Sequence, residues 1–155
     1  LKERGELENT IIVYSSDHGD MLGDHGYWEK HRPYHSCLGV PLVMAGPEMQ
    51  KGIVQDGPTT LLDLTATFLD YGNVEIPNDM DSLSMRSLLE GKTTGHRDYV
   101  YSALEEWRLV FDGRFKLAEG FGTDPLLFDL QNDPNENHNI ARENPSKLSE
   151  LSDKL

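Results

Sequence analysis

The sequence predicts an α/β fold in which the edge of an α/β sheet is followed by a small antiparallel sheet with a terminal helix. The first half contains apolar, β-branched runs with little alternation, which is typical of strands covered on both faces in a parallel sheet. The second half contains short strand-like runs and a strong hairpin signal at Asp112-Gly113. The length of 155 residues and the 37% of hydrophobic residues are sufficient for a buried core.

The first predicted domain covers residues 1–95. Its two predicted strands are TIIVYS (10–15) and VPLVMAG (40–46), and a loop rich in glycine and histidine joins them. The spacing of apolar residues after Pro58 predicts a helix, and Gly72 is the signal that ends it. A helix end closed by Gly5 precedes the first strand, and the order of helix, strand and loop indicates an α/β unit.

The second predicted domain covers residues 96–155. Its strand-like runs are YVYSALE, RLVFDGRFKLAE and PLLFDL, and a terminal helix is expected from Pro145. The two strands of the first domain are too few for a parallel sheet, and the opening LKERGELEN reads as the tail of a helix. We therefore expect the chain to be a piece of a longer protein whose N-terminal part is missing. Produced alone, the piece should self-associate through its uncovered strands or fold only marginally.

The charge of the chain restricts its partners. Lys and Arg number 14 against 27 Asp and Glu, which gives a formal net charge of −13. Such an acidic surface repels nucleic acid and anionic membranes, so neither is an expected partner. An anionic substrate would have to be attracted locally, by a metal ion or a well-placed cation. Cys37 is the single cysteine, which excludes an internal disulfide and any zinc site with several cysteines.

The segment SSDHGDMLGDHGYWEK (15–30) carries the candidate metal ligands. Asp17 and His18 follow the first predicted strand, at the sheet edge where open α/β folds bind ligands. Neighbours on a strand point to opposite faces, so Gly19 is expected to let the backbone bend until both side chains reach one ion. A carboxylate suits Ca²⁺ or Mg²⁺ and an imidazole suits transition metals, which leaves the metal open. Two ligands are too few, so further carboxylates must come from elsewhere.

Lys30 and His25 are the candidate residues for substrate binding and catalysis. A lysine ammonium can hold a sulfate or phosphate oxygen, although Lys30 could also be an ordinary surface lysine. His25 could protonate a leaving group or hold a substrate oxygen, or it could bond the loop backbone. His31 and His35 have helical metal spacing, but Pro33 between them argues against that helix.

The run TIIVYSSDHGDMLGDHGYWEKHRPYHSCLGVPLVMAGP resembles the second metal-binding segment of the sulfatase family, within the alkaline phosphatase superfamily. The runs TTLLDLTATFLDYG, GRFKLAE and LLFDLQNDPNENHNIA are similar to the helix and the C-terminal subdomain of that family. The resemblance covers nearly the whole chain. It implies the C-terminal fragment of a sulfatase, an enzyme that hydrolyses sulfuric esters, with the edge of an alkaline-phosphatase-like sheet.

The resemblance also implies roles for the candidate residues. Asp17 and His18 match the pair that completes a divalent-metal site, usually of Ca²⁺, with Mg²⁺ and Mn²⁺ still open. Lys30 matches the lysine that contacts the sulfate of the substrate, and His25 lies in the loop near the leaving group. The formylglycine nucleophile of such enzymes arises in a C/S-x-P-x-R motif that this chain lacks. The nucleophile is therefore expected in the missing N-terminal part, and this chain alone should be inactive.

The chain departs from the family pattern at two positions, and two other functions remain possible. Ala66 stands where the family often has proline and Ser82 where it often has glycine, and both are expected to matter only locally. The rival enzyme is a phosphonate or phosphate ester hydrolase of the same superfamily, and the rival from another class is a non-catalytic binding domain that retains the fold. A periplasmic or secreted location is favoured over the cytoplasm because it fits a sulfatase that degrades polymers.

Overall fold

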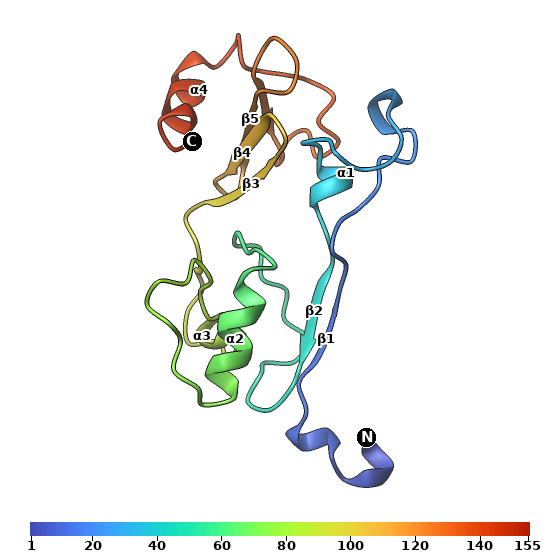
Figure 1. Cartoon of the computed structure of the whole chain (residues 1–155), viewed down its shortest axis with the longest axis vertical. Helices are drawn as coiled ribbons and strands as arrows, with labels where there is room; N and C mark the ends of the chain where they lie inside the picture. The colour runs from blue at the N-terminus through green and yellow to red at the C-terminus, as the bar shows by residue number, and fades with distance from the viewer. The chain divides into compact units, whose positions relative to one another are not determined.

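The structure is a computed structural model that describes residues 1–155, and its elements are traced in Figure 1. The chain forms two compact units. Unit 1 consists of residues 1–16 and 41–97, and unit 2 consists of residues 17–40 and 98–155. The segment that connects the two strands of unit 1 therefore belongs to unit 2. The division into domains 1–95 and 96–155 concerns the complete enzyme and stays a prediction.

Unit 1 contains two paired strands, β1 (Ile12–Ser15) and β2 (Leu42–Ala45), which run side by side in Figure 1. They pair antiparallel, with Ile12 opposite Ala45. The apolar runs resemble strands of a parallel sheet, but an apolar run indicates burial and not the direction of the neighbouring strand. Parts of the two strands are uncovered within this chain. Their exposed apolar side chains are Ile12, Tyr14 and Val43.

The main helix of unit 1 is α2 (Asp63–Tyr71), and a short helix α3 (Arg86–Leu89) packs beside it. The helix begins later than Pro58 because the residues before it form a tight turn, in which the Asp63 N–H donates to the Thr60 carbonyl (3.0 Å). It ends before Gly72, as the sequence predicts. At the chain start, the expected helix tail consists of two short 3₁₀ turns, η1 (Lys2–Arg4) and η2 (Leu7–Asn9).

Asp63 is a buried carboxylate that fastens α2 to the rest of unit 1. It accepts hydrogen bonds from Arg97 Nε (2.9 Å), from His96 Nε2 (2.9 Å) and from the Leu83 backbone N–H (2.9 Å). Burial by itself raises the pKa of this carboxyl, but the hydrogen bonds from Arg97, Leu83 and His96 outweigh it and the pKa is lowered. His96 thus has a structural role in unit 1.

The two departures from the family pattern, Ala66 and Ser82, turn out to be linked. The Ser82 hydroxyl donates to the Leu62 carbonyl (2.5 Å) and accepts from the Ala66 N–H (2.9 Å). In a regular helix that N–H would bond the carbonyl four residues earlier, so the hydroxyl is inserted into the helix ladder. A proline at position 66 would have no N–H to satisfy, and a glycine at position 82 no hydroxyl. The two departures are therefore coupled through one local contact.

Unit 2 is built on a four-stranded antiparallel sheet, which confirms the prediction for the second half. The strands follow in chain order: β3 (Val100–Leu104), β4 (Trp107–Phe111), β5 (Phe115–Glu119) and β6 (Leu126–Asp129). The hairpin at Asp112-Gly113 is present, with Gly113 at a φ of 94° and the Asp112 carboxylate accepting from the Phe115 N–H (2.6 Å). The strand pairing aligns side chains into two distinct faces.

Each face of this sheet has its own cover. One face presents Val110, Leu117 and Leu127 to the terminal helix α4 (Pro145–Ser152), whose buried Leu151 completes that core. The other face presents Trp107, Leu109 and Ala118, and Leu38 packs against them. Leu38 is the last residue of the short helix α1 (His35–Leu38) in the segment 17–40. The segment that carries the candidate site residues therefore packs against the second face.

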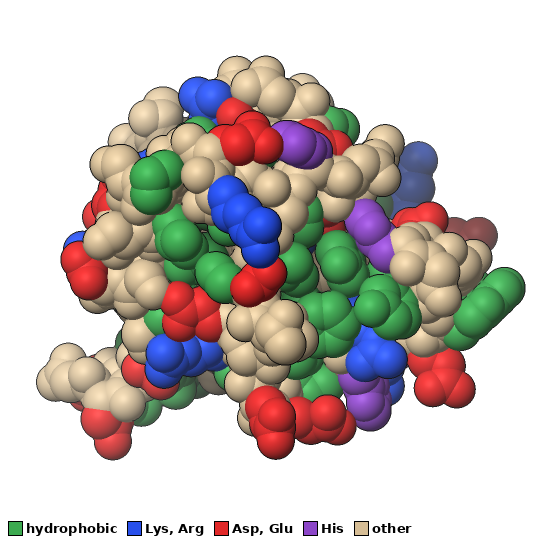
Figure 2. All heavy atoms as spheres, turned by 90° about the horizontal axis from the view of Figure 1, so that it is seen from above, with side chains coloured by type: hydrophobic (Ala, Val, Ile, Leu, Met, Phe, Trp, Pro, Cys, Tyr) green, Lys and Arg blue, Asp and Glu red, His purple; other side chains and the backbone are tan.

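Acidic side chains are present on the face of the molecule shown in Figure 2, but they do not gather into a single large patch. On that face, Asp and Glu side chains are dispersed among Lys, Arg and apolar side chains. No helix of the structure has both the length and the apolar character needed to cross a bilayer.

Candidate metal and anion site

Asp17 and His18 lie two and three residues after the end of β1, and their side chains reach the same point. Asp17 Oδ2 is 3.6 Å from His18 Nε2, and the carboxylate is 87% exposed against 39% for the imidazole. Adjacent residues of a strand would point apart, so the backbone has left strand geometry here. The structure thus brings together the two side chains that the sequence proposes as neighbours on one ion.

Gly19 is needed for a reason other than the flexibility that the sequence suggests. A Cβ on Gly19 would lie 1.9 Å from the backbone oxygen of Ser36, a distance that no side chain can occupy. The Gly19 N–H also donates to the Cys37 carbonyl (2.7 Å). The two ends of the segment 17–40 therefore touch backbone to backbone directly beside His18, and only glycine permits that approach.

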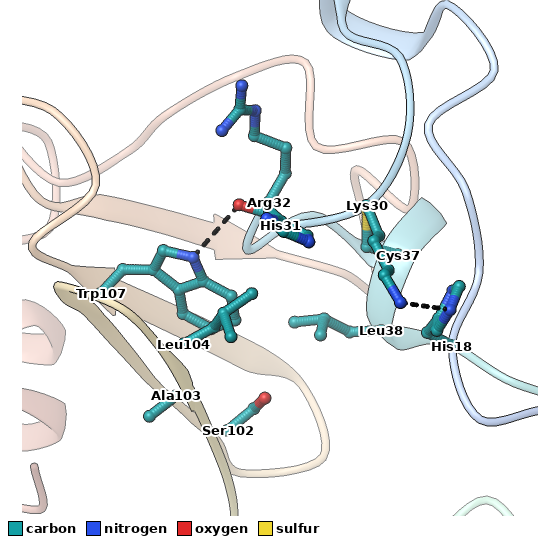
Figure 3. Close-up of a pocket in the computed structure, with 10 residues that line it drawn as sticks. All are labelled: His18, Lys30, His31, Arg32, Cys37, Leu38, Ser102, Ala103, Leu104 and Trp107. Carbon is teal, nitrogen blue, oxygen red and sulfur yellow. Dashed lines mark hydrogen bonds between the residues drawn. The ribbon is translucent and has the colours of Figure 1, made fainter.

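His18 is held in a defined tautomer. Its Nδ1 is 2.7 Å from the Gly19 carbonyl, so Nδ1 carries the proton and donates it. Its Nε2 then accepts from the Lys30 ammonium at 2.9 Å, the contact drawn in Figure 3. An imidazole that donates Nδ1–H to a carbonyl and presents Nε2 is the usual arrangement of a metal-ligating histidine. Asp17, His18 and Lys30 thus form one cluster, hereafter the DHK cluster.

The carboxylate of the DHK cluster is kept ionised. The pKa of Asp17 is lowered by the His18 imidazole, because an imidazole is protonated at the acid pH where a carboxyl titrates. The His18 backbone N–H, which donates to Asp17 Oδ1 at 3.0 Å, lowers that pKa further. An ionised oxygen and an imidazole nitrogen are both proper donors for a divalent cation.

The chain supplies only part of a metal site. No group of three or more His, Cys, Asp or Glu side chains gathers anywhere in the chain in a way that could hold an ion. A hard divalent cation takes about six oxygen or nitrogen ligands, and the DHK cluster offers two. The two residues therefore fit one side of a divalent-metal site and are too few to hold an ion by themselves.

The backbone on both sides of Lys30 is fixed in an unusual conformation. Glu29 and His31 have φ angles of 65° and 80°, values that non-glycine residues rarely adopt. The Glu29 carbonyl accepts from the buried Met21 N–H (2.9 Å), and the His31 carbonyl accepts from the Trp107 indole N–H (3.3 Å). Strained backbone of this kind persists where surrounding contacts enforce it, and it concentrates at functional sites.

A pocket of about 290 Å³ adjoins the cluster on the side of β3 and β4. The drawn residues in Figure 3 line it: His18, Lys30, His31, Arg32, Cys37, Leu38, Ser102, Ala103, Leu104 and Trp107. Its walls are apolar on one side, and the nitrogens of His18 and Lys30 lie at its edge. The Arg32 guanidinium is directed elsewhere, onto the ring of Tyr27 at 4.7 Å.

His25 has a different setting from the DHK cluster. Its ring stacks on Tyr34 with ring centroids 4.0 Å apart and 13° between the planes. Tyr34 is also in contact with Tyr27, so Tyr27 packs within the loop. Trp28, the next residue, is 70% exposed. Cys37 is buried.

Two buried charged residues of unit 2 were not predicted from the sequence. Lys116 and Glu136 are buried charged residues beneath the segment 17–40, and they form an ion pair. The available signals were a lysine inside the apolar strand run FKLA and a glutamate within the turn DPNEN. Neither signal distinguishes a buried pair from two surface residues.

The fold places the chain among proteins with the alkaline-phosphatase-like fold of sulfatases. A solved structure described as a complex with its substrate D-glucosamine-2-N,6-O-disulfate superposes with a TM-score of 0.91 at 31% identity, over 100% of this chain and 35% of that chain. Residues 23–155 match the family described as N-sulphoglucosamine sulphohydrolase, C-terminal. The chain belongs to this family.

Two curated relatives illustrate the coverage. An arylsulfatase of Clostridium perfringens is 33% identical over 90% of this chain, and an N-acetylglucosamine-6-O-sulfatase of Bacteroides thetaiotaomicron is 34% identical over 90% of it. The chain spans 31% and 28% of their respective lengths. A phosphonate monoester hydrolase from Silicibacter pomeroyi is also similar in structure, with a TM-score of 0.87 at 32% identity over 99% of this chain and 35% of that chain.

Proposed function

We propose that this chain is the C-terminal part of a sulfatase that hydrolyses sulfuric esters. In this proposal Asp17 and His18 ligate a divalent metal ion, and Lys30 holds an oxygen of the substrate sulfate. The observation that carries the proposal is the DHK cluster: Asp17 Oδ2 lies 3.6 Å and Lys30 Nζ 2.9 Å from the same atom, His18 Nε2. A carboxylate, an imidazole and an ammonium that converge in this way suit an ion together with its bound oxyanion.

The metal ligands act through their protonation states. Asp17 binds as the carboxylate, and His18 binds through Nε2 because its proton is held on Nδ1 by the Gly19 carbonyl. A bound divalent ion would neutralise charge on the sulfate oxygens and favour attack at sulfur. We propose Ca²⁺ as the ion, with Mg²⁺ and Mn²⁺ as the alternatives to be compared.

Lys30 binds and orients the anion. In this structure its ammonium donates to the nitrogen that would ligate the ion, so this hydrogen bond would be lost if an ion were bound at Nε2. The Lys30 ammonium would then be available to donate to a non-bridging sulfate oxygen. A compact cation at this place stabilises negative charge that grows on the oxygens during ester cleavage.

The leaving group is proposed to enter the pocket beside the cluster. Leu38, Leu104 and Trp107 give this pocket an apolar wall next to the Lys30 ammonium, which suits the carbon skeleton of an ester. The two relatives named for glucosamine sulfates support sulfated sugars as the first esters to assay. His25 is proposed to assist the leaving group, because stacking on Tyr34 occupies its ring face and leaves its two nitrogens at the ring edge.

The nucleophile is proposed to come from the part of the enzyme outside this chain. A formylglycine made from a C/S-x-P-x-R motif would be that nucleophile, and no such motif occurs within residues 1–155. The remaining metal ligands are proposed to come from the same part. A periplasmic or secreted location is supported by an extracellular sulfatase relative of Drosophila melanogaster, which is 42% identical over 99 residues.

The test uses the complete enzyme and a chromogenic aryl sulfate. The wild-type enzyme should release sulfate, Asp17→Ala should abolish turnover, and Lys30→Ala should lower kcat by about 10²-fold or more. Calorimetry should show that Asp17→Ala also weakens divalent-metal binding. An Asp17→Ala enzyme with wild-type metal affinity and turnover would refute the metal assignment, and a normal kcat for Lys30→Ala would return Lys30 to the surface lysines.

A second candidate is a phosphonate or phosphate ester hydrolase, and the similarity to the Silicibacter pomeroyi enzyme favours it specifically. The two activities are separated by comparing kcat/KM for aryl sulfates with kcat/KM for phosphonate and phosphate monoesters. Preference for the phosphorus esters would replace the sulfatase proposal. A complete protein that binds no divalent ion and cleaves none of these esters would instead be a non-catalytic domain.

A further inference from the structure

The sheet face beneath the segment 17–40 contains a lysine where an apolar residue would be expected. Lys116 is 3% exposed and pairs across the sheet with Phe111 and Phe128. Burial lowers the pKa of Lys116, although the neighbouring Glu136 opposes that effect. A buried charge costs free energy unless it is paired and hydrogen-bonded, so its presence here calls for a specific role.

The contacts of Lys116 reach the segment above it. Its Nζ donates to the Pro33 carbonyl (2.7 Å) and forms an ion pair with Glu136 Oε1. The other oxygen of the same carboxylate, Glu136 Oε2, accepts from the His35 backbone N–H (2.7 Å). Both charged groups therefore bond the backbone on either side of Tyr34, in addition to each other.

These backbone atoms lie between the parts of the candidate site. Pro33 is three residues after Lys30, and His35 is two residues before Cys37. The Cys37 carbonyl accepts from the Gly19 N–H, and Gly19 follows His18 directly. The buried pair thus holds the short stretch that links the proposed sulfate lysine to the backbone beside the proposed metal histidine.

We propose that Lys116 and Glu136 are positioning residues, which fix where the Lys30 ammonium stands relative to Asp17 and His18. The inference rests on the function proposed for Lys30. A purely stabilising role is disfavoured by physical chemistry, because a buried ion pair commonly adds no stability over an apolar pair of similar volume. Backbone hydrogen bonds from both charged groups are something that an apolar pair cannot provide.

The decisive experiment is a double-mutant cycle in the complete enzyme. Glu136→Gln keeps the shape of the side chain and removes its charge. With Lys30 present, Glu136→Gln should lower kcat/KM by about 10-fold or more, because small displacements of a binding group are costly. With Lys30→Ala, the same change should alter kcat/KM by less than about 2-fold, because the group that it positions is gone. Equal losses in both backgrounds would overturn the inference.

A matched control separates positioning from general destabilisation. Asp129 forms an ion pair with Arg114 in the same sheet, and its contacts do not involve the segment 17–40. Asp129→Asn should leave kcat/KM unchanged. A Lys30-dependent loss in that variant equal to the loss in Glu136→Gln would also overturn the inference. If Glu136→Gln does not fold, Lys116→Met combined with Glu136→Gln takes its place, because that variant leaves no uncompensated buried charge.

Backbone amide exchange gives a readout that does not depend on turnover. Glu136→Gln should speed exchange over residues 30–37, beginning with the His35 amide, whereas Asp129→Asn should not. Unchanged exchange in Glu136→Gln would refute the positioning role. Lys30→Ala with full activity would refute the proposed function of Lys30 instead, so the two failures are distinguishable.

Discussion

Each unit contains a buried carboxylate in ion pairs, Asp63 in unit 1 and Glu136 in unit 2, and the two carboxylates serve different parts of the protein. In unit 1, Asp63 accepts hydrogen bonds from Arg97, His96 and the Leu83 N–H, and these bonds hold α2 against the neighbouring segments. In unit 2, Lys116 and Glu136 direct their hydrogen bonds to the backbone of the segment 17–40, which carries the proposed site residues. Similar electrostatics therefore support the fold in one unit and the geometry of the proposed site in the other.

The largest effect on stability is expected at Asp63. Asp63→Ala should lower the free energy of unfolding by about 3–5 kcal/mol, because it leaves the largely buried Arg97 without its counter-charge. Urea denaturation measures the loss. The comparison predicts that the folded fraction keeps its kcat, unlike Glu136→Gln. A selective loss of kcat with wild-type stability would show that the two pairs do not differ as described.

An intermediate effect is expected from the hydroxyl inserted into α2. Ser82→Gly should cost about 1–3 kcal/mol, because the buried Ala66 N–H and the Leu62 carbonyl lose their shared partner. In an Ala66→Pro background the same change should cost less, since no N–H remains to be left unpaired. Urea denaturation of all four proteins measures this coupling. If the losses in the free energy of unfolding are additive, Ser82 and Ala66 are not coupled, and this contact does not support the fold of unit 1 in the way described.

The smallest effect is expected at the more exposed pair of unit 2. Two hydrogen bonds from Arg114 lower the pKa of Asp129 to about 2, against about 3.8 for the ordinary carboxyl. A folded-state pKa below the unfolded value contributes stability above about pH 4 that is lost as pH falls toward 2. Asp129→Asn should therefore lose less stability than wild type over that interval, as urea titrations at several pH values would show. Equal losses would mean that this pair contributes nothing.

Local patterns in the sequence were sufficient for the elements and for part of the site. The hairpin at Asp112-Gly113, the helix ending at Gly72 and the strands of unit 2 follow from turn signals and periodicity. Asp17, His18 and Lys30 were proposed from a short segment, and the structure brings their side chains together. Their roles as ligands remain predictions.

Features that depend on contacts between residues far apart in the sequence could not be predicted from the sequence. β1 and β2 pair antiparallel, and an apolar run cannot predict this direction because it indicates only burial. Lys116 and Glu136 are 20 positions apart, and each alone resembles a surface residue. The bridge from Ser82 to Ala66 likewise depends on the folded position of a loop. Tertiary contacts of this kind leave no local periodicity to detect.

The contact between Gly19 and Ser36 has a genetic consequence. Every missense change in the codon for residue 19 adds at least a Cβ, which the Ser36 oxygen at 1.9 Å forbids. Alleles altered at this codon should therefore behave as nulls even when the substituted amino acid is alanine, the mildest replacement available.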